Sequence, residues 1–353
     1  MPTREEILTA LALVIDPELR KPVTELDMVR EIRIDGADVA VTIALTVVGC
    51  PLRSSFEDQV ARHVGTLPSV ASVTLHFDVM TPDERAALTM KLRGGAETTV
   101  VQLPATTRVL AIASGKGGVG KSSLTVNLAA SLSLLGREVG ILDADIYGHS
   151  IPHMLGIHQK PVVVDKMIIP PVAHDLKLMS IGFFVDDNAP VMWRGPMLHR
   201  ALEQFLQDVH WGEIDVLVVD MPPGTGDVSI SLGQLLPRAE VVVVTTPQPL
   251  AQEVASRAAT MAQKTGMRVV GVIENMTSEV FGSGGGERLA AELGVRMLGH
   301  VPLDSRVRES ADAGVPLVVS DPDSEPAQVI FELAQAIDGS RAGGFTRTLP
   351  LVS

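Results

Sequence analysis

The sequence predicts an α/β fold in which helices cover both faces of a mostly parallel sheet, preceded by a small α+β domain. From residue 107 onward, short and nearly continuous apolar runs alternate with segments of helix length. Such runs are typical of parallel strands that are buried on both faces. The expected strands are Val109–Ala113, Glu138–Leu142, Asp215–Val219, Glu240–Thr245, Arg268–Ile273 and Met297–Val301.

Length and composition predict about two domains and disfavour several classes of protein. The chain has 353 residues, of which 46% are hydrophobic, and domains average roughly 150 residues. A formal net charge of −13 disfavours nucleic acid as a partner, because phosphate neutralisation needs clustered Lys and Arg. The apolar runs are strand-sized, whereas a membrane-spanning helix needs about 20 apolar residues. Since the start of the chain also lacks the apolar core of a secretory signal, we expect a cytoplasmic protein without a membrane partner.

The first 80 residues predict the small α+β domain. Asp35-Gly36 lies between two alternating apolar and polar runs, which is a strong hairpin signal. The expected elements are a helix over Ile7–Ile15, strands over Val29–Ile34 and Val39–Leu45, a helix over Ser54–Leu67 and a strand over Val70–Phe77. We interpret residues 81–106 as a partly helical linker, residues 107–338 as the second domain and residues 339–353 as a flexible tail.

A phosphate-binding loop is predicted directly after the first strand of the second domain. The segment Gly115-Lys116-Gly117-Gly118-Val119-Gly120-Lys121-Ser122-Ser123 matches the pattern G-x-x-x-x-G-K-[ST] between a strand and a helix. Glycines let backbone N–H groups turn toward a phosphate, and the helix N-terminus adds a partial positive charge. Lys121 is expected to contact the terminal phosphates, and the Ser122 hydroxyl to bind Mg²⁺. The motif therefore predicts a P-loop ATPase that binds ATP and Mg²⁺.

Two of the predicted strands lead into aspartates. Asp143 and Asp145 follow one strand, and Asp220 follows another. Ligands of open α/β sheets bind at the carboxyl ends of the strands, where these carboxylates should lie. We expect Asp220 to orient Mg²⁺, Asp143 to support its ligand shell and Asp145 to position the attacking water. A helix-capping role for Asp143 remains open.

The first lysine of the loop, Lys116, makes the motif more specific. The form K-G-G-x-G-K-S resembles the deviant Walker A motif of the MinD/ParA class of P-loop ATPases. This resemblance implies a homodimer in which Lys116 reaches the partner's nucleotide and stabilises the transition state, the role that an arginine finger has elsewhere. The alternative interpretation is a solvated loop lysine.

Several further motifs resemble the Mrp/ApbC family of cytosolic ATPases, which are implicated in carrying and delivering iron–sulfur clusters. They are Asp143-Ala-Asp-Ile-Tyr-Gly-His-Ser-Ile-Pro152, Trp193-Arg-Gly-Pro-Met197, Asp220-Met-Pro-Pro-Gly-Thr-Gly-Asp227, Glu274-Asn-Met276 and Phe281-Gly-Ser-Gly-Gly-Gly286. The resemblance covers about residues 105–338. It implies that Asn275 reads the adenine and that a segment containing Pro302 and Asp304 wraps the base. Asn275 could instead be a turn former at a strand end. Iron–sulfur assembly proteins or apoprotein clients are the implied partners.

The N-terminal residues 4–80 resemble the small PaaD/SufT-like domain that precedes the ATPase in many Mrp proteins. Asp16-Pro17-Glu18 and Thr46-Val-Val-Gly-Cys-Pro51 carry this resemblance. Proteins with this domain are also linked to iron–sulfur maturation, so the two halves of the chain imply the same process.

The family pattern breaks at the cysteines. Cluster-carrying members usually have a C-x-x-C between the Asn-Met dipeptide and the glycine-rich stretch, where this chain has only Thr277-Ser-Glu-Val280. Cys50 is the single cysteine, so it is the one candidate thiolate for a [4Fe-4S] cluster. A small buried cysteine is the alternative interpretation. A regulatory or positioning ATPase switch without a bound cluster therefore remains the second functional hypothesis.

Overall fold

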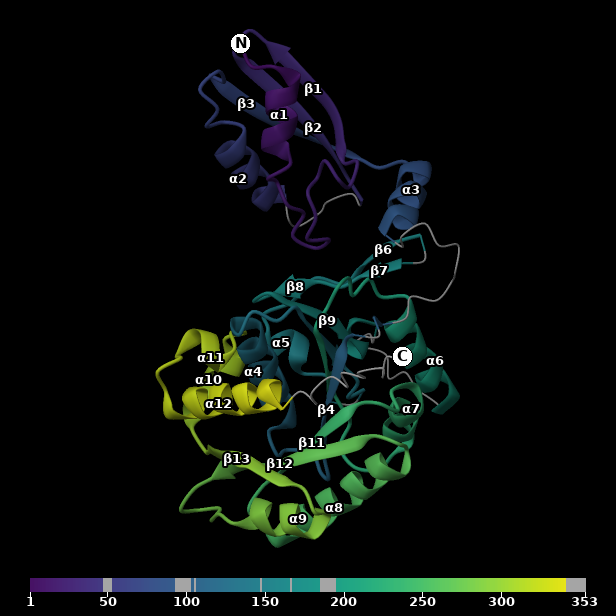
Figure 1. Ribbon diagram of the computed structural model, residues 1–353, viewed down its shortest axis with the longest axis vertical. Coiled ribbons are helices and arrows are strands. Elements are labelled where there is room, and N and C mark those ends of the chain that lie inside the picture. Colours follow the sequence, from purple (N-terminus) through teal and green to yellow (C-terminus); the bar gives the residue numbers. More distant parts are fainter. Residues whose placement is uncertain are drawn as a thin grey trace, which may run out of the picture. The chain divides into compact units, whose positions relative to one another are not determined.

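Figure 1 presents the computed structural model, which describes residues 1–46, 53–92, 103–104, 106–146, 148–165, 167–184 and 195–340. The chain divides into two compact units, which are described separately. The first comprises Met1–Leu103, Gln159–Val172 and Leu206–Gly212, and the second comprises Pro104–His158, Ala173–Phe205 and Glu213–Ser353. No helix in these described ranges is long and apolar enough to cross a membrane.

The first unit contains a three-stranded sheet in the order β1-β2-β3. Strand β1 pairs antiparallel with β2 through the hairpin predicted at Asp35-Gly36, where Gly36 has a φ of +64°. Strand β2 pairs parallel with β3, and α2 makes the crossover between them. The elements are α1 (Arg4–Leu11), β1 (Val29–Asp35), β2 (Asp38–Leu45), α2 (Arg53–His63), β3 (Ser72–Val79) and α3 (Pro82–Leu92).

This unit extends beyond the predicted domain of residues 1–80. Helix α3 lies within residues 81–106, which the sequence indicated as a partly helical linker. A second addition is the antiparallel pair β6 (Val162–Val164) and β7 (Met167–Ile169), whose buried side chains join the core of the first unit. Strands of three residues are too short to show an alternating pattern, which explains why the sequence did not reveal them.

The second unit contains an eight-stranded sheet in the order β13-β12-β11-β4-β10-β5-β9-β8. The pairs from β13 through β9 are all parallel. This architecture confirms the predicted fold class. The strands are β4 (Arg108–Ser114), β5 (Val139–Asp143), β8 (Val172–Ala173), β9 (Leu176–Ser180), β10 (Val216–Asp220), β11 (Glu240–Thr245), β12 (Arg268–Thr277) and β13 (Arg296–Pro302).

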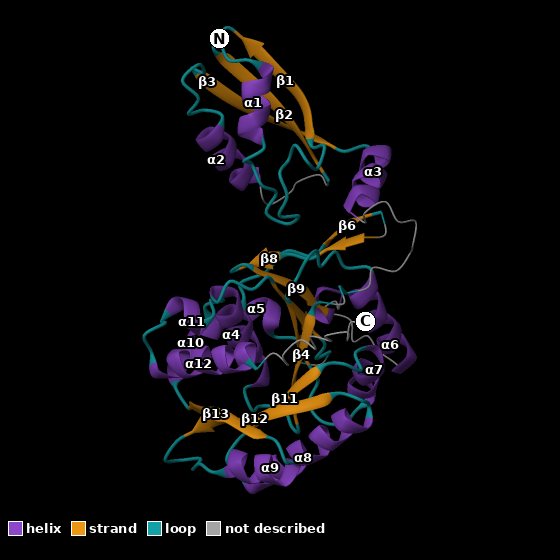
Figure 2. Ribbon diagram, in the orientation of Figure 1, coloured by secondary structure: helices purple, strands orange, loops and turns teal. Residues whose placement is uncertain are grey.

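Helices cover both faces of this sheet (Figures 1 and 2). Helices α4 and α12 pack together on one face, and α8 and α9 pack on the other. All five residues of β10 are buried between these layers. The remaining elements include α4 (Lys121–Leu134), α5 (Ile151–Met154), the 3₁₀ turn η1 (Ile181–Phe184), α6 (Gly195–Gln207), α7 (Asp227–Leu235), α8 (Pro249–Lys264), α9 (Gly285–Leu293), α10 (Ser305–Asp312), α11 (Leu317–Ser320) and α12 (Glu325–Gly339).

Candidate nucleotide site

The predicted phosphate loop joins β4 to α4, and its glycines are required by the geometry. Gly118 and Gly120 have φ values of +80° and +79°, a backbone conformation that side chains disfavour. A Cβ on Gly115 would overlap the backbone of Val254 and Ala255 in α8. The loop is therefore held close against α8, with its carboxyl end leading directly into the N-terminus of α4.

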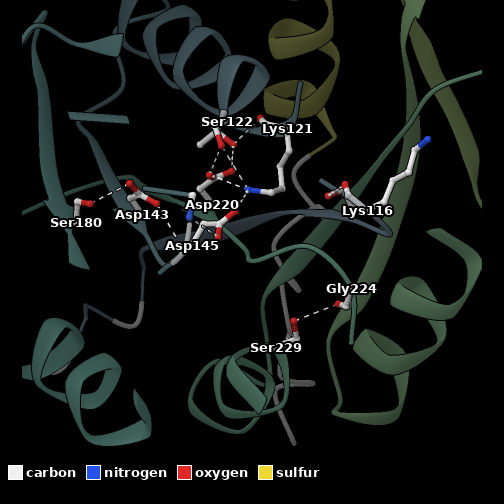
Figure 3. A network of polar contacts seen from close by, with 12 residues as sticks. Lys116, Lys121, Ser122, Asp143, Asp145, Ser180, Asp220, Gly224 and Ser229 are labelled. Atoms are coloured by element: carbon white, nitrogen blue, oxygen red, sulfur yellow. Dashed lines mark hydrogen bonds and ion pairs between the residues drawn. The ribbon is translucent and has the colours of Figure 1, made fainter. Parts of the chain in front are cut away.

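Lys121 lies in a buried cluster of opposite charges at the start of α4 (Figure 3). Its Nζ is 2.8 Å from Asp220 Oδ2 and 3.5 Å from Asp145 Oδ2. The lysine is only 5% exposed, and Asp220 is fully buried. Because a buried charge is tolerated when it is paired, the two residues hold each other in place at the end of β10.

Two hydroxyl groups contact the two oxygens of Asp220. Ser122 Oγ donates a hydrogen bond of 2.6 Å to Oδ2, and Thr125 Oγ1 lies 2.7 Å from Oδ1. Hydroxyl and carboxylate oxygens are ligands that Mg²⁺ prefers, so Ser122 and Asp220 fit this ion. Thr125 lies outside the sequence motif that predicted Lys121 and Ser122. Its position four residues after Lys121 on the same helix is the signal that could have found it.

Asp143 ends β5, directly opposite Asp220 in the parallel register. Its carboxyl is fully buried and accepts a hydrogen bond of 2.9 Å from Ser180 Oγ. Burial and the nearby charge of Asp220 raise the pKa of Asp143 to about 8. Its place beside Asp220 on the adjacent strand, with Ser180 as its hydrogen-bond donor, favours a supporting role for Asp143. Ser180, on β9, is a second contact that the sequence did not indicate.

The two remaining charged residues that the sequence predicted for the site, Asp145 and Lys116, point in different directions. Asp145 lines the cavity beside the loop, and its Oδ1 accepts the N–H of Gly148 at 3.2 Å. The side chain of Lys116 instead extends away from the cluster around Lys121 and Asp220 (Figure 3). The structure of one chain therefore brings Asp145 to the site and leaves Lys116 pointing outward.

Two adjoining cavities follow the phosphate loop. The first, of about 380 Å³, is lined by Ser114, Lys116, Gly117, Gly118, Gly120, Lys121, Ser122, Ser123, Asp145, Gly148, Ser150, Met154 and Pro223. The second, of about 260 Å³, is lined by Gly120, Ser123, Met154, Asn275, Met276, Pro302, Leu303, Asp304, Val307, Arg308, Ala311 and Asp312. Their shared residues lie at the start of α4 and in α5, so one elongated ligand can occupy both cavities.

The residues expected to contact the base meet in this second cavity. Asn275, at the end of β12, is buried, and its Nδ2 donates a hydrogen bond of 2.8 Å to the carbonyl of Val119 in the phosphate loop. Pro302 lies in the cavity wall. Asp304 caps the N-terminus of α10, and hydrogen bonds from Arg306 lower the pKa of its carboxyl to about 2. The Asp304 side chain is therefore occupied in capping α10, and the segment around it forms part of the wall of the second cavity.

Apolar side chains complete the wall of the second cavity, and no sequence motif indicated them. Met276 has a φ of +63°, which is unusual for a residue other than glycine. It lines the cavity together with Met154 and Leu303. Apolar residues of this kind carry no motif, so only the spatial arrangement identifies them.

The N-terminal motif Asp16-Pro17-Glu18 forms a tight turn in the first unit. Asp16 is buried, and its Oδ1 accepts the N–H groups of Glu18 at 2.8 Å and Leu19 at 2.9 Å. Burial and the charge of Asp16 raise the pKa of the partly buried Glu18 to about 7. Cys50, the predicted thiolate, lies outside the described residues.

The short connection after Asn275 is a tight turn. Backbone hydrogen bonds join Ser278 and Gly282 in both directions, over 3.3 Å and 2.7 Å. Val280 at its tip is 84% exposed. The segment for which the family resemblance implies a C-x-x-C therefore forms a tight turn, and its residues 277–282 include no cysteine.

Comparison with known proteins identifies the family. Residues 105–338 match the NUBPL iron-transfer P-loop NTPase family. The chain belongs to this family. Residues 4–75 separately match the iron–sulfur cluster assembly protein family, in agreement with the resemblance of the N-terminal domain.

Related proteins of this family extend over nearly the whole chain. An iron–sulfur cluster carrier protein of Mycobacterium tuberculosis is 50% identical over 357 residues, covering 96% of this chain and 93% of that protein. A protein of the same name from Bacillus subtilis is 42% identical over 311 residues, covering 85% and 88% of the two chains. Both domains of the chain are thus shared with carrier proteins.

Solved structures share the fold of the second unit. A nucleotide-binding protein of Archaeoglobus fulgidus in complex with ADP is 34% identical, with a TM-score of 0.53, and the match covers 62% of this chain and 89% of that one. The septum site-determining protein MinD of Pyrococcus horikoshii with Mg-ADP is 25% identical, with a TM-score of 0.53, covering 66% and 96%. These matches agree with the predicted class of P-loop protein.

Proposed function

We propose that this chain binds ATP with Mg²⁺ and hydrolyses it to ADP and phosphate. The buried contact between Lys121 and Asp220 beneath the phosphate loop carries this proposal. It joins the motif lysine to the carboxylate at the end of the neighbouring strand, and Ser122 lies against the same carboxylate. These are the parts that P-loop NTPases use for phosphoryl transfer.

The residues have distinct tasks in the proposed reaction. Lys121 neutralises the phosphate oxygens, and Asp145 positions the water whose oxygen forms the new bond to the γ-phosphorus as the bond to the β–γ bridging oxygen breaks. Ser122 and Asp220 would hold Mg²⁺, and the bound ion would supply additional positive charge to the phosphates. Asp143 supports Asp220 from the adjacent strand. Asn275 and the wall around Pro302 hold the base.

The active form is proposed to be a homodimer in which each subunit completes the other's site. Lys116 is partly exposed and points away from its own Lys121–Asp220 cluster (Figure 3). This orientation supports a role at a second subunit, where the lysine would stabilise charge on the partner's nucleotide in the transition state.

The proposed cargo is an iron–sulfur cluster that is delivered to apoprotein clients. Support comes from the carrier proteins that share both domains and from the iron–sulfur assembly match of the first unit. Cys50 is the one thiolate that a subunit can offer, so a dimer would hold a [4Fe-4S] cluster with one cysteine from each chain.

The single cysteine also favours a second candidate function, a regulatory ATPase switch that binds no cluster. Anaerobic reconstitution with iron and sulfide separates the two functions. A carrier should gain a cluster chromophore and bound iron in the wild type and lose both in Cys50→Ser. A wild type without a cysteine-dependent chromophore would leave the switch as the function of this ATPase.

The ATPase proposal has its own test in the substitution Lys121→Ala. We expect this variant to lose Mg²⁺-dependent ATP hydrolysis, while Lys264→Ala, which changes an exposed lysine at the end of α8, retains it. Release of phosphate from purified, folded protein is the measurement. Unchanged hydrolysis in Lys121→Ala would refute the site.

A further inference from the structure

Three side chains with metal-binding groups converge outside the nucleotide site. Glu274 comes from β12, Glu287 from the first turn of α9, and His300 from the edge strand β13. Glu274 and His300 are paired neighbours in the parallel register. One ligand atom from each residue lies within 4.8 Å of the other two.

Glu274 is the fixed member of this cluster. It is fully buried, and its two carboxylate oxygens accept the N–H groups of Gly284 at 3.0 Å and Gly286 at 2.5 Å. Backbone hydrogen bonds of this kind orient a carboxylate that binds a metal. A buried carboxylate also needs a positive partner, because burial penalises its charge.

His300 lies between the two glutamates. Its Nδ1 is 3.1 Å from Glu274 Oε1, and its Nε2 is 2.9 Å from Glu287 Oε1. A neutral imidazole has only one N–H, so one of these contacts would place a ring lone pair against a carboxylate oxygen. A proton on the ring or on one of the carboxyl groups, or a metal ion, would relieve this contact.

Within the described part of the chain, His300 is the only basic side chain paired with these carboxylates. Among the ion pairs of the described residues, none joins a lysine or an arginine to Glu274 or Glu287. The neighbouring Arg288 instead donates to Gln252. The positive charge that balances these two carboxylates is therefore expected beside His300.

We propose that Glu274, Glu287 and His300 bind a divalent first-row transition-metal ion. One imidazole nitrogen with carboxylate oxygens suits such ions, whereas iron–sulfur clusters are held mainly by thiolates. Metal–ligand bonds of about 2.0–2.2 Å require ligand atoms to lie within about 4.4 Å of one another. The three ligand atoms lie within 4.8 Å of one another, so a small shift of the side chains brings them into this range.

The exposed side of the cluster gives the ion a path from solvent. The side chains of His300 and Glu287 are 38% and 50% exposed, and β13 lies at the edge of the sheet. Three protein ligands leave coordination positions open for water, as in zinc sites that are not purely structural. This site shares no residue with the phosphate loop, so the test of metal binding does not depend on the ATPase proposal.

Calorimetric titration with Zn²⁺ tests the proposal on the full chain. Protein freed of metal by a chelator is titrated at neutral pH in excess Mg²⁺, which competes for the carboxylates beside the phosphate loop. The wild type should bind one Zn²⁺ per chain that His300→Ala does not bind. Glu287→Gln should weaken this binding about 10- to 100-fold. His158→Ala, at an exposed histidine outside the cluster, should bind as the wild type does.

Thermal unfolding provides the second readout and tests the proton as the alternative cation. Zn²⁺ should raise the melting temperature of the wild type and of His158→Ala but not that of His300→Ala. Equal Zn²⁺ stoichiometry in the wild type, His300→Ala and Glu287→Gln would overturn the proposal. It would also be overturned if Zn²⁺ left the wild type unchanged and His300→Ala lost stability only in acid, because the bridging cation would then be a proton.

Discussion

The ammonium group of Lys121 lies 2.8 Å from the carboxylate of Asp220, and both side chains are buried. The pairing results from topology, because β4 leads into the helix that carries Lys121 and its neighbour β10 ends at Asp220. The two residues are 99 positions apart in sequence, yet the parallel register fixes their separation. This contact is the structural basis of the proposed ATPase.

Thr125 should orient Asp220 for Mg²⁺ binding. Its hydroxyl lies 2.7 Å from Asp220 Oδ1, so Thr125→Val removes a hydrogen bond while keeping the side-chain shape. We expect the Mg²⁺ concentration that gives half-maximal ATP hydrolysis to rise about 10- to 100-fold, as for lost outer contacts of metal ligands. Thr125→Ser should restore the wild-type value. Normal Mg²⁺ dependence in the valine variant would show that Thr125 only packs in the helix.

Gly120 and Gly339 form a matched pair for testing the nucleotide loop. A Cβ on Gly120 would overlap the amide of Asn275, and its φ is +79°. A Cβ on Gly339, at the end of α12 and outside the site, would meet nothing within 4 Å. Gly120→Ala should therefore abolish measurable ADP binding in equilibrium titration and cost about 1 kcal/mol of stability or more. Gly339→Ala should bind ADP nearly as the wild type does. Equal ADP affinity in both variants would contradict the assigned geometry.

Glu18 should make the stability of the first unit depend on pH. Its pKa rises from 4.5 to about 7 on folding, so folding takes up a proton between these values. Wild-type stability should then fall as the pH rises from 4.5 to 7. Glu18→Gln removes this penalty, and it should stabilise the unit by up to about 3 kcal/mol at pH above 7 but have little effect below pH 4.5.

Urea unfolding at acidic and alkaline pH measures this difference. Glu57→Gln, at an exposed position of α2, is the control and should follow the wild type at both pH values. The account of Glu18 would be wrong if Glu18→Gln and the wild type showed the same change of stability with pH.

Local motifs made most of the fold and the phosphate loop predictable. Residues 115–123 are contiguous, so their spacing reveals the loop without knowledge of the fold. The central strands were equally clear, because a strand buried on both faces is apolar throughout, as β10 is. Strand β9 was missed because Lys177, although buried, interrupts its apolar run.

Contacts between distant segments could not be predicted in the same way. Ser180 reaches Asp143 only because β9 pairs with β5. Likewise, Glu274 and His300 meet through the pairing of β12 with β13, and Glu287 joins them through the start of α9. No motif marks these residues, since their relationship depends on strand order and register.

Mixing Lys116→Ala with Lys121→Ala tests the two-subunit ATPase most directly. Each variant alone should be inactive, because the first lacks the lysine supplied to the partner and the second lacks the phosphate-binding lysine. In a mixed dimer, the Lys121→Ala subunit supplies Lys116 to the intact phosphate loop of the other. Hydrolysis should recover to about a quarter of the wild-type rate, because about half of the dimers are mixed and each has one complete site. No recovery, with mixed dimers demonstrated by co-purification of two tags, would contradict the account.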